Sequence, residues 1–169
     1  MLQIPVKAAA VRNLTDARYF AAREVEWIGF TIEPENGNQV AEVRAMKEWL
    51  DGVQFMAEFS LQGADEIRQV AEYLEIDTVQ VSHFTSVETV QELMGLQVHK
   101  TVIVSPEDTL ATVLDHLEEY QGLVAAFQLD LTRVSNEQWP LQHVQRLAQE
   151  HALWIDRVWD PNTLLEWWG

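Results

Sequence analysis

The sequence predicts an α/β protein built around a parallel sheet. Short apolar runs alternate with amphipathic helical patterns along the chain, and this strand-helix unit recurs about every 24 residues, giving seven units. Most of the apolar runs are near-continuous, which is typical of parallel strands buried on both faces. The length of 169 residues and the ordinary apolar content favour one domain over residues 1–169.

The predicted strands are the apolar runs at residues 4–10, 27–32, 53–59, 78–82, 98–104, 123–129 and 153–156. Helix starts are predicted by capping boxes at 85–88 and 135–138, and by an acceptor before proline at Ser105-Pro106 and Asp160-Pro161. Apolar residues then share one helical face in three places: Ile67, Val70, Ala71 and Leu74; Leu110, Val113, Leu114 and Leu117; and Leu141, Val144 and Leu147.

Composition excludes several classes of protein. A formal charge of −16 repels polyanions, so we expect neither nucleic acid nor an anionic membrane as partner. The absence of cysteine excludes disulfides, zinc-thiolate sites and thiol nucleophiles. The five histidines lack paired ligand spacing, so neither a metal nor another cofactor is expected. Without a signal-like segment or an apolar run of membrane-spanning length, we expect a soluble cytoplasmic protein.

Seven βα units are compatible with either an open doubly wound sheet or a barrel. The seven glycines are never closer than eight positions apart, so neither a dinucleotide fingerprint nor a P-loop exists. Steric rules and glycine spacing leave both architectures open.

Several segments nevertheless match one family in chain order. The run 6–17 (VKAAAVRNLTDA) with 27–30 (WIGF) resembles the opening of phosphoribosylanthranilate isomerase, an enzyme of tryptophan biosynthesis. Shorter matches follow at 77–81 (DTVQV), 98–100 (VHK), 127–130 (FQLD) and 160–162 (DPN). The resemblance implies a TIM-barrel-like (β/α) fold. Because the chain ends at Gly169, we expect it to be incomplete, with seven parallel strands.

The resemblance also implies the chemistry. The family carries out an Amadori-type rearrangement of an aminated phosphoribose, in which an acid opens the sugar ring and a base removes the C2 proton. The acid corresponds to Asp130, and the base corresponds to Ala9, which cannot accept a proton. Asp130 has an alternative, structural interpretation as a strand-end residue that bonds to loop amides.

Further positions depart from the family pattern. Its first-strand glycine is Ala10 here, its glycine-rich segment after the sixth strand is replaced by residues 131–139, and its glycine pair after the seventh strand falls at Arg157 and Val158. Glycine lets backbone amides approach a phosphate closely, so these replacements predict a weakened phosphate site. The positions that the resemblance assigns to binding of a small phosphorylated ligand are Lys7, Arg12, Gln80, Lys100 and Arg157.

Two residues are candidates for a relocated base, Glu58 near the end of the third predicted strand and His83 near the end of the fourth. We expect Lys7 and Lys100 to point into the barrel interior or its mouth, in ion pairs with carboxylates such as Asp130, Glu58 or Asp156.

Four tryptophans, Trp154, Trp159, Trp167 and Trp168, cluster at the C-terminus. Without an eighth unit the first and seventh strands have open edges, and such edges attract another chain. We expect the indoles to plug the opening or to form a homodimer there. Two functions follow: a catalytically inactive relative that keeps the scaffold for binding or interaction, or an isomerase using Asp130 and a relocated base.

Overall fold

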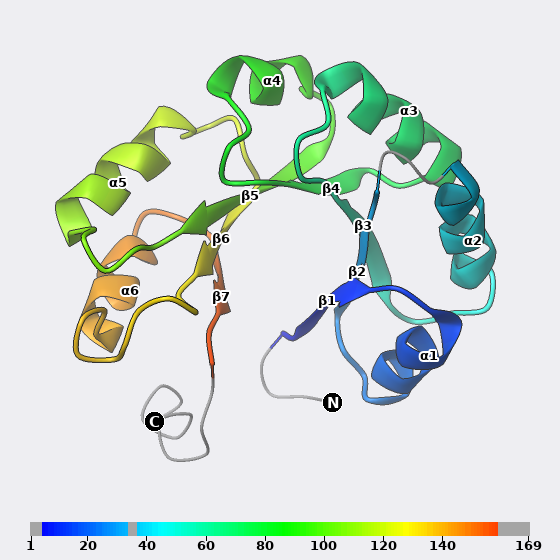
Figure 1. Cartoon of the computed structure of the whole chain (residues 1–169), viewed down its shortest axis with the longest axis horizontal. Coiled ribbons are helices and arrows are strands. Elements are labelled where there is room, and N and C mark those ends of the chain that lie inside the picture. Colours follow the sequence, from blue (N-terminus) through cyan, green and yellow to red (C-terminus); the bar gives the residue numbers. More distant parts are fainter. Residues whose placement is uncertain (1–4, 34–36, 159–169) are drawn as a thin grey trace. The chain divides into compact units, whose positions relative to one another are not determined.

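The structure is a computed structural model, and it describes residues 5–33 and 37–158. The chain forms two compact units, which we call the N-terminal unit (Met1–Val98) and the C-terminal unit (His99–Gly169). In each unit the helices lie against one face of the strands (Figure 1). Among the described residues no helix has the length and apolar character needed to cross a membrane.

The N-terminal unit contains four strand-helix pairs: β1 (Lys7–Val11), α1 (Leu14–Ala22), β2 (Trp27–Thr31), α2 (Gly37–Lys47), β3 (Gln54–Glu58), α3 (Ala64–Leu74), β4 (Thr78–Val81) and α4 (Val87–Glu92). Its neighbouring strands are parallel and consecutive in sequence, with Thr31 beside Glu58 and Glu58 beside Gln80. The strand ends of this unit therefore place Thr31, Glu58 and Gln80 in one row.

The C-terminal unit continues the same pattern with β5 (Gln97–Ile103), α5 (Leu110–Glu119), β6 (Ala126–Asp130), α6 (Leu141–Leu147) and β7 (Leu153–Asp156). β5 pairs with β6 and β6 with β7, again in parallel. The seven predicted strands are therefore confirmed. The sixth begins at Ala126 instead of residue 123, because the Leu123 amide is still bonded to the Tyr120 carbonyl in a turn.

Alternate residues of the strands face in opposite directions. In the N-terminal unit, Ile28, Phe30 and Val79 are almost fully buried, and Phe30 stacks on Phe55 with ring centroids 6.1 Å apart. Helix residues with the predicted spacing are buried as well, including Ile67, Ala71, Leu74, Val113, Leu117, Val144 and Leu147. The opposite strand face carries Lys7, Thr31, Glu58 and Gln80 beside the apolar Trp27 and Met56. We call it the polar strand face, and the candidate site lies there.

The starts of α4 and α5 differ from the sequence-based prediction. The cap of α4 is Ser86, which accepts a hydrogen bond from the Thr89 amide, and not Thr85. Ser105 and Asp108 close a turn, and α5 begins later with a capping box between Thr109 and Thr112. In both places the cap is a hydroxyl residue that lies later in the chain than the predicted one.

The predicted box at 135–138 does form, since Ser135 and Gln138 exchange hydrogen bonds of 3.0 and 3.2 Å. It closes a turn ahead of Pro140, and α6 starts at Leu141. The predicted cap at Asp160-Pro161 lies outside the described residues.

Candidate functional site

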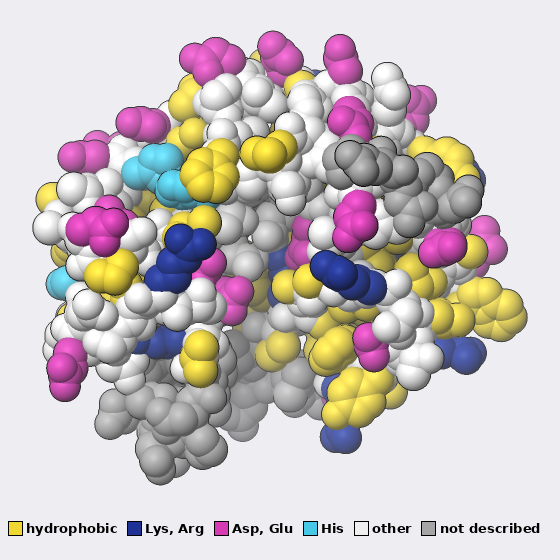
Figure 2. All heavy atoms as spheres, viewed as in Figure 1, with side chains coloured by type: hydrophobic (Ala, Val, Ile, Leu, Met, Phe, Trp, Pro, Cys, Tyr) yellow, Lys and Arg dark blue, Asp and Glu magenta, His cyan; other side chains and the backbone are white. Residues whose placement is uncertain are grey.

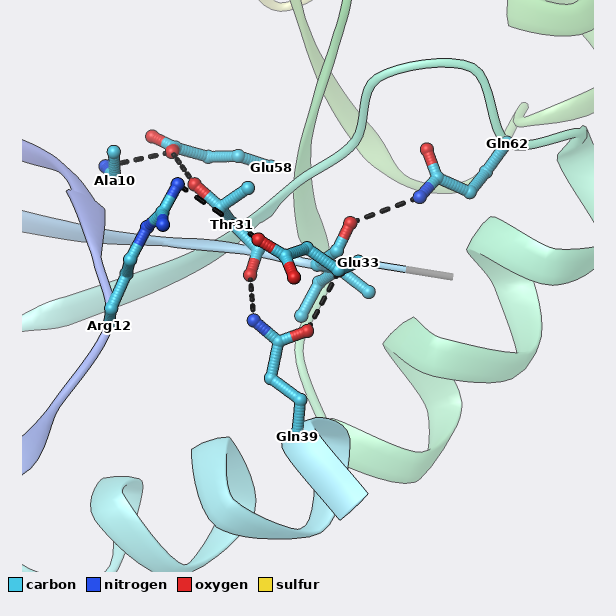
Figure 3. A network of polar contacts seen from close by, with 8 residues as sticks. Ala10, Arg12, Thr31, Glu33, Gln39, Glu58 and Gln62 are labelled. Atoms are coloured by element: carbon cyan, nitrogen blue, oxygen red, sulfur yellow. Dashed lines mark hydrogen bonds and ion pairs between the residues drawn. The ribbon is translucent and has the colours of Figure 1, made fainter. Parts of the chain in front are cut away.

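A buried carboxylate is the centre of the polar strand face in the N-terminal unit. Glu58 ends β3, and its Oε1 lies 2.9 Å from Lys7 Nζ. Its Oε2 accepts hydrogen bonds from the Ala10 amide at 2.9 Å and from the Thr31 hydroxyl at 3.4 Å (Figure 3). Lys7 also donates to Gln80 Oε1. We call these five residues the Glu58 network.

Two backbone features of the neighbouring strands make room for this network. A Cβ atom added to Gly29 in β2 would lie 2.1 Å from Glu58 Oε1, so the carboxylate occupies space that any other residue would fill. In β1 the pairing register is interrupted between Ala8 and Val11, and Ala10 has a left-handed φ of 54°. This irregularity accompanies the hydrogen bond from the Ala10 amide to Glu58.

The loop after β2 is held by side chains at the rim of the N-terminal unit. Gln39 donates to the Thr31 carbonyl and accepts from the Glu33 amide, both at 2.8 Å. Arg12 lies 4.0 Å from Glu33 in an exposed ion pair (Figure 3). Each basic residue that the resemblance assigned to the ligand in this unit, Lys7 and Arg12, thus lies beside a carboxylate.

The two candidates for a relocated base differ in their surroundings. Glu58 accepts a hydrogen bond from the amide of Ala10. Ala10 follows Ala9, the position where the resemblance implies the base. His83 is half-buried in the loop after β4, and its ring packs edge-on against Phe84, with centroids 5.2 Å apart. The structure therefore places Glu58 against the residue that follows Ala9, and the resemblance implies the base at Ala9.

In the C-terminal unit, Asp130 ends β6 and turns toward its own loop. Its Oδ1 accepts from the Thr132 amide at 3.0 Å and from the Thr132 hydroxyl at 2.6 Å. These are the hydrogen bonds that the structural interpretation of Asp130 predicts. A role as general acid stays a prediction.

The loop 131–139, at the place of the family's glycine-rich segment, is a packed turn. Leu131, Val134 and Trp139 are buried, at 0%, 8% and 1% exposure. Six of its amides donate hydrogen bonds to acceptors within the unit: those of Leu131, Thr132, Val134, Ser135, Gln138 and Trp139. Amides engaged in this way are not available to a phosphate group.

Lys100 corrects one expectation. Its ammonium group lies 4.8 Å from the centroid of the Tyr120 ring at the end of α5, so the side chain faces the helix layer and not the barrel interior. Lys100 is fully buried, and burial lowers its pKa to about 8. The prediction was wrong because the strand register places Lys100 on the apolar face.

Trp154 lies in β7 of the same unit, and Arg157 directly follows that strand. Arg157 is buried, donates to the Trp139 carbonyl at 3.5 Å, and has its pKa lowered by burial. Trp154 is half-buried and stacks on His99 with centroids 6.4 Å apart. Trp159, Trp167 and Trp168 lie outside the described residues, so the plug or homodimer that they suggest stays a prediction.

Sequence reasoning missed Gly29, which leaves room for Glu58, and two glutamines: Gln39, which donates to the Thr31 carbonyl, and Gln62, which donates to the Ile32 carbonyl. An isolated glycine inside a strand signals a close approach, so Gly29 had a usable signal. A glutamine whose side chain hydrogen-bonds to a loop backbone, as Gln39 and Gln62 do, has no comparable signal in the sequence. Over residues 5–33 and 37–158, no cluster of three or more His, Asp or Glu side chains is suited to a metal ion.

No family sequence model and no curated protein sequence matches the chain. Several solved protein structures do match the chain. Phosphoribosylanthranilate isomerase from Thermotoga maritima is 20% identical with a TM-score of 0.75, covering 97% of this chain and 82% of its own. The isomerase from Thermus thermophilus is 18% identical with a TM-score of 0.74, at 96% and 81%.

A third isomerase structure holds reduced 1-(o-carboxyphenylamino)-1-deoxyribulose 5-phosphate, and it is 18% identical with a TM-score of 0.61, at 92% and 87% coverage. These matches extend over most of each chain, and they confirm the resemblance at the level of the fold. The chain therefore has the TIM-barrel-like α/β fold of the phosphoribosylanthranilate isomerases.

Proposed function

We propose that this protein is a catalytically inactive relative of phosphoribosylanthranilate isomerase that keeps the scaffold for binding or interaction. The observation that carries the proposal is the loop 131–139, whose amides bond inside the C-terminal unit and whose apolar side chains are buried. In the family that the chain resembles, this segment is rich in glycine and helps bind the substrate phosphate. A packed turn cannot serve that purpose.

The surroundings of Ala9 support the same conclusion. Alanine has no proton acceptor, and both oxygens of the nearby Glu58 are engaged, one by Lys7 and one by Ala10 and Thr31. Lys7 and Arg12 each lie beside a carboxylate, which offsets the positive charge that would attract a phosphorylated anion. Base and phosphate cradle are thus both lost.

A calorimetric titration tests this proposal. The probe is reduced 1-(o-carboxyphenylamino)-1-deoxyribulose 5-phosphate, the compound held by one of the similar isomerase structures. We expect no binding at about millimolar concentration, which corresponds to a binding free energy weaker than about −4 kcal/mol. Micromolar binding would contradict the proposal.

The variant Ala9→Cys separates the missing base from the missing cradle. If the cradle is absent, a cysteine at this position restores neither binding of the probe nor isomerase activity. Turnover by Ala9→Cys alone would show that a working phosphate site remains, and the inactive-scaffold proposal would then apply to the base only.

The second candidate is an isomerase with a relocated base, favoured by one observation: Glu58 Oε2 lies 2.9 Å from the amide of Ala10, next to the lost base. In this reaction Asp130 would protonate the ring oxygen and Glu58 would remove the C2 proton. The test is isomerase turnover by the unaltered chain. Loss of that turnover in Glu58→Gln and in Asp130→Asn, but not in the control Glu42→Gln, an exposed residue of α2, would establish the second candidate.

A further inference from the structure

Two apolar side chains stand exposed on neighbouring loops of the N-terminal unit. Leu61, in the loop after β3, is 82% exposed, and Phe84, in the loop after β4, is 73% exposed. β3 and β4 are parallel and paired, and the Phe59 amide extends the pairing by donating to the Gln80 carbonyl. Both loops therefore leave the sheet at its carboxyl edge, which is the edge where (β/α) barrels bind their ligands.

Both loops are held in place by their own hydrogen bonds. Gln62 is buried; its Oε1 accepts from the amides of Ser60 and Leu61, and its Nε2 donates to the Ile32 carbonyl (Figure 3). The Phe84 amide donates to Ser82 Oγ at 3.3 Å. Loops ordered in advance lose little conformational freedom when a partner binds, so the exposed side chains are suited to serve as anchors.

The charged side chains that follow these anchors in the first turns of α3 and α4 are negative. The next cation along α3 is Arg68, whose guanidinium donates to the Glu92 and Met94 carbonyls. Asp65 and Glu66 lie in the first turn of α3, and Glu88 lies in the first turn of α4. Segments 60–67 and 82–92 contain no lysine or arginine. Figure 2 shows hydrophobic side chains and carboxylates exposed together over α3 and α4. A partner that complements this surface carries apolar side chains flanked by basic ones.

We propose that Leu61 and Phe84, with Asp65, Glu66 and Glu88, form a docking surface for a basic amphipathic segment of another protein. The apolar residues of the segment cover Leu61 and Phe84, and its lysines or arginines face the three carboxylates. This inference rests on the interaction role proposed above and supplies its kind of partner. It concerns the rim of the N-terminal unit and needs no phosphate site.

The test uses a fluorescently labelled short amphipathic peptide of leucine and lysine as the probe, followed by fluorescence anisotropy. The double variant Leu61→Ser/Phe84→Ser is expected to bind the peptide about tenfold more weakly than the unaltered chain. The matched control is Met94→Ser, which removes another apolar side chain, 81% exposed, from the segment between α4 and β5. This control should retain its affinity.

A second peptide, with every leucine replaced by serine and the lysines kept, measures attraction by charge alone. We expect it to bind at least about tenfold more weakly than the first. Equal binding of the two peptides, or an equal loss in the Met94→Ser control, would overturn the proposal. Circular dichroism of the variants checks that they fold.

The outcome is independent of the isomerase titration. Binding of the phosphorylated probe would contradict the inactive-scaffold proposal and leave the peptide result standing. Failure of the peptide test would remove this surface and leave the catalytic question untouched.

Discussion

Gly29 is the residue on which the Glu58 network depends most directly. Its missing Cβ leaves the space that Glu58 Oε1 occupies, because the added atom would lie only 2.1 Å away. We expect Gly29→Ala to displace the carboxylate from Lys7 and to lower the free energy of unfolding by about 1–3 kcal/mol. Urea denaturation measures this change.

Gly63 provides the control for that substitution. It has an extended backbone, with φ −77° and ψ 166°, and a Cβ added there meets no atom within 4 Å. Gly63→Ala is expected to change the free energy of unfolding by about 0.5 kcal/mol at most. Equal losses at the two glycines would mean that the contact with Glu58 is not the cause.

Replacing Ala10 by glycine is expected to raise the free energy of unfolding, the opposite of the effect at Gly29. Its φ of 54° lies in the left-handed region, which costs a residue with a Cβ about 1 kcal/mol or more and costs glycine nothing. Ala10→Gly also loosens the unfolded chain, which offsets part of the gain. We expect a net stabilisation of up to about 1 kcal/mol in thermal or urea unfolding. A loss of stability would contradict this account of the β1 irregularity.

Among the elements, α4 offers a matched pair of cap variants. The Ser86 side chain accepts from the Thr89 amide, whereas sequence favoured Thr85 as the cap. Ser86→Ala is expected to lower the free energy of unfolding by about 1 kcal/mol, since it leaves a helix amide without its acceptor. Thr85→Ala should cost less. The reverse order, measured by urea denaturation, would assign the cap to Thr85.

The contact between β5 and α5 predicts a pH dependence. Burial lowers the pKa of Lys100 to about 8 from an ordinary value of 10.5, so the unfolded chain holds this proton more tightly. The resulting destabilisation is fully present below pH 8 and is relieved as pH rises toward 10.5. The free energy of unfolding of the unaltered chain, measured by urea denaturation, should therefore rise between pH 8 and pH 10.5. The variant Lys100→Met should lack this rise. Parallel curves for both proteins would contradict the prediction.

At the scale of the whole molecule, the charge of −16 predicts a dependence on salt. Self-repulsion among carboxylates destabilises the compact chain, and salt screens it within about 10 Å at 0.1 M. We expect the melting temperature to rise by a few degrees between low and moderate sodium chloride concentration. A melting temperature that falls with salt would mean that exposed ion pairs, such as Arg44 with Glu75, outweigh the general repulsion.

The order of strands and helices could be predicted from the sequence because hydrophobic periodicity is a local property. Runs such as 27–32 and 78–82 reappear as β2 and β4 with almost the same bounds. The alanine at position 9, where the resemblance implies a base, and the absence of glycine from 131–139 were equally visible, since both depend on residue type alone.

The arrangement around these residues was not predictable in the same way, because it depends on contacts between segments far apart in the chain. Glu58 meets Lys7 and Ala10 across about 50 positions, and only the strand register brings them together. The same register turns Lys100 toward Tyr120 instead of the polar face. Residue types and their spacing thus determine the elements and the departures from the family's motifs, whereas the pairing of strands determines which side chains meet.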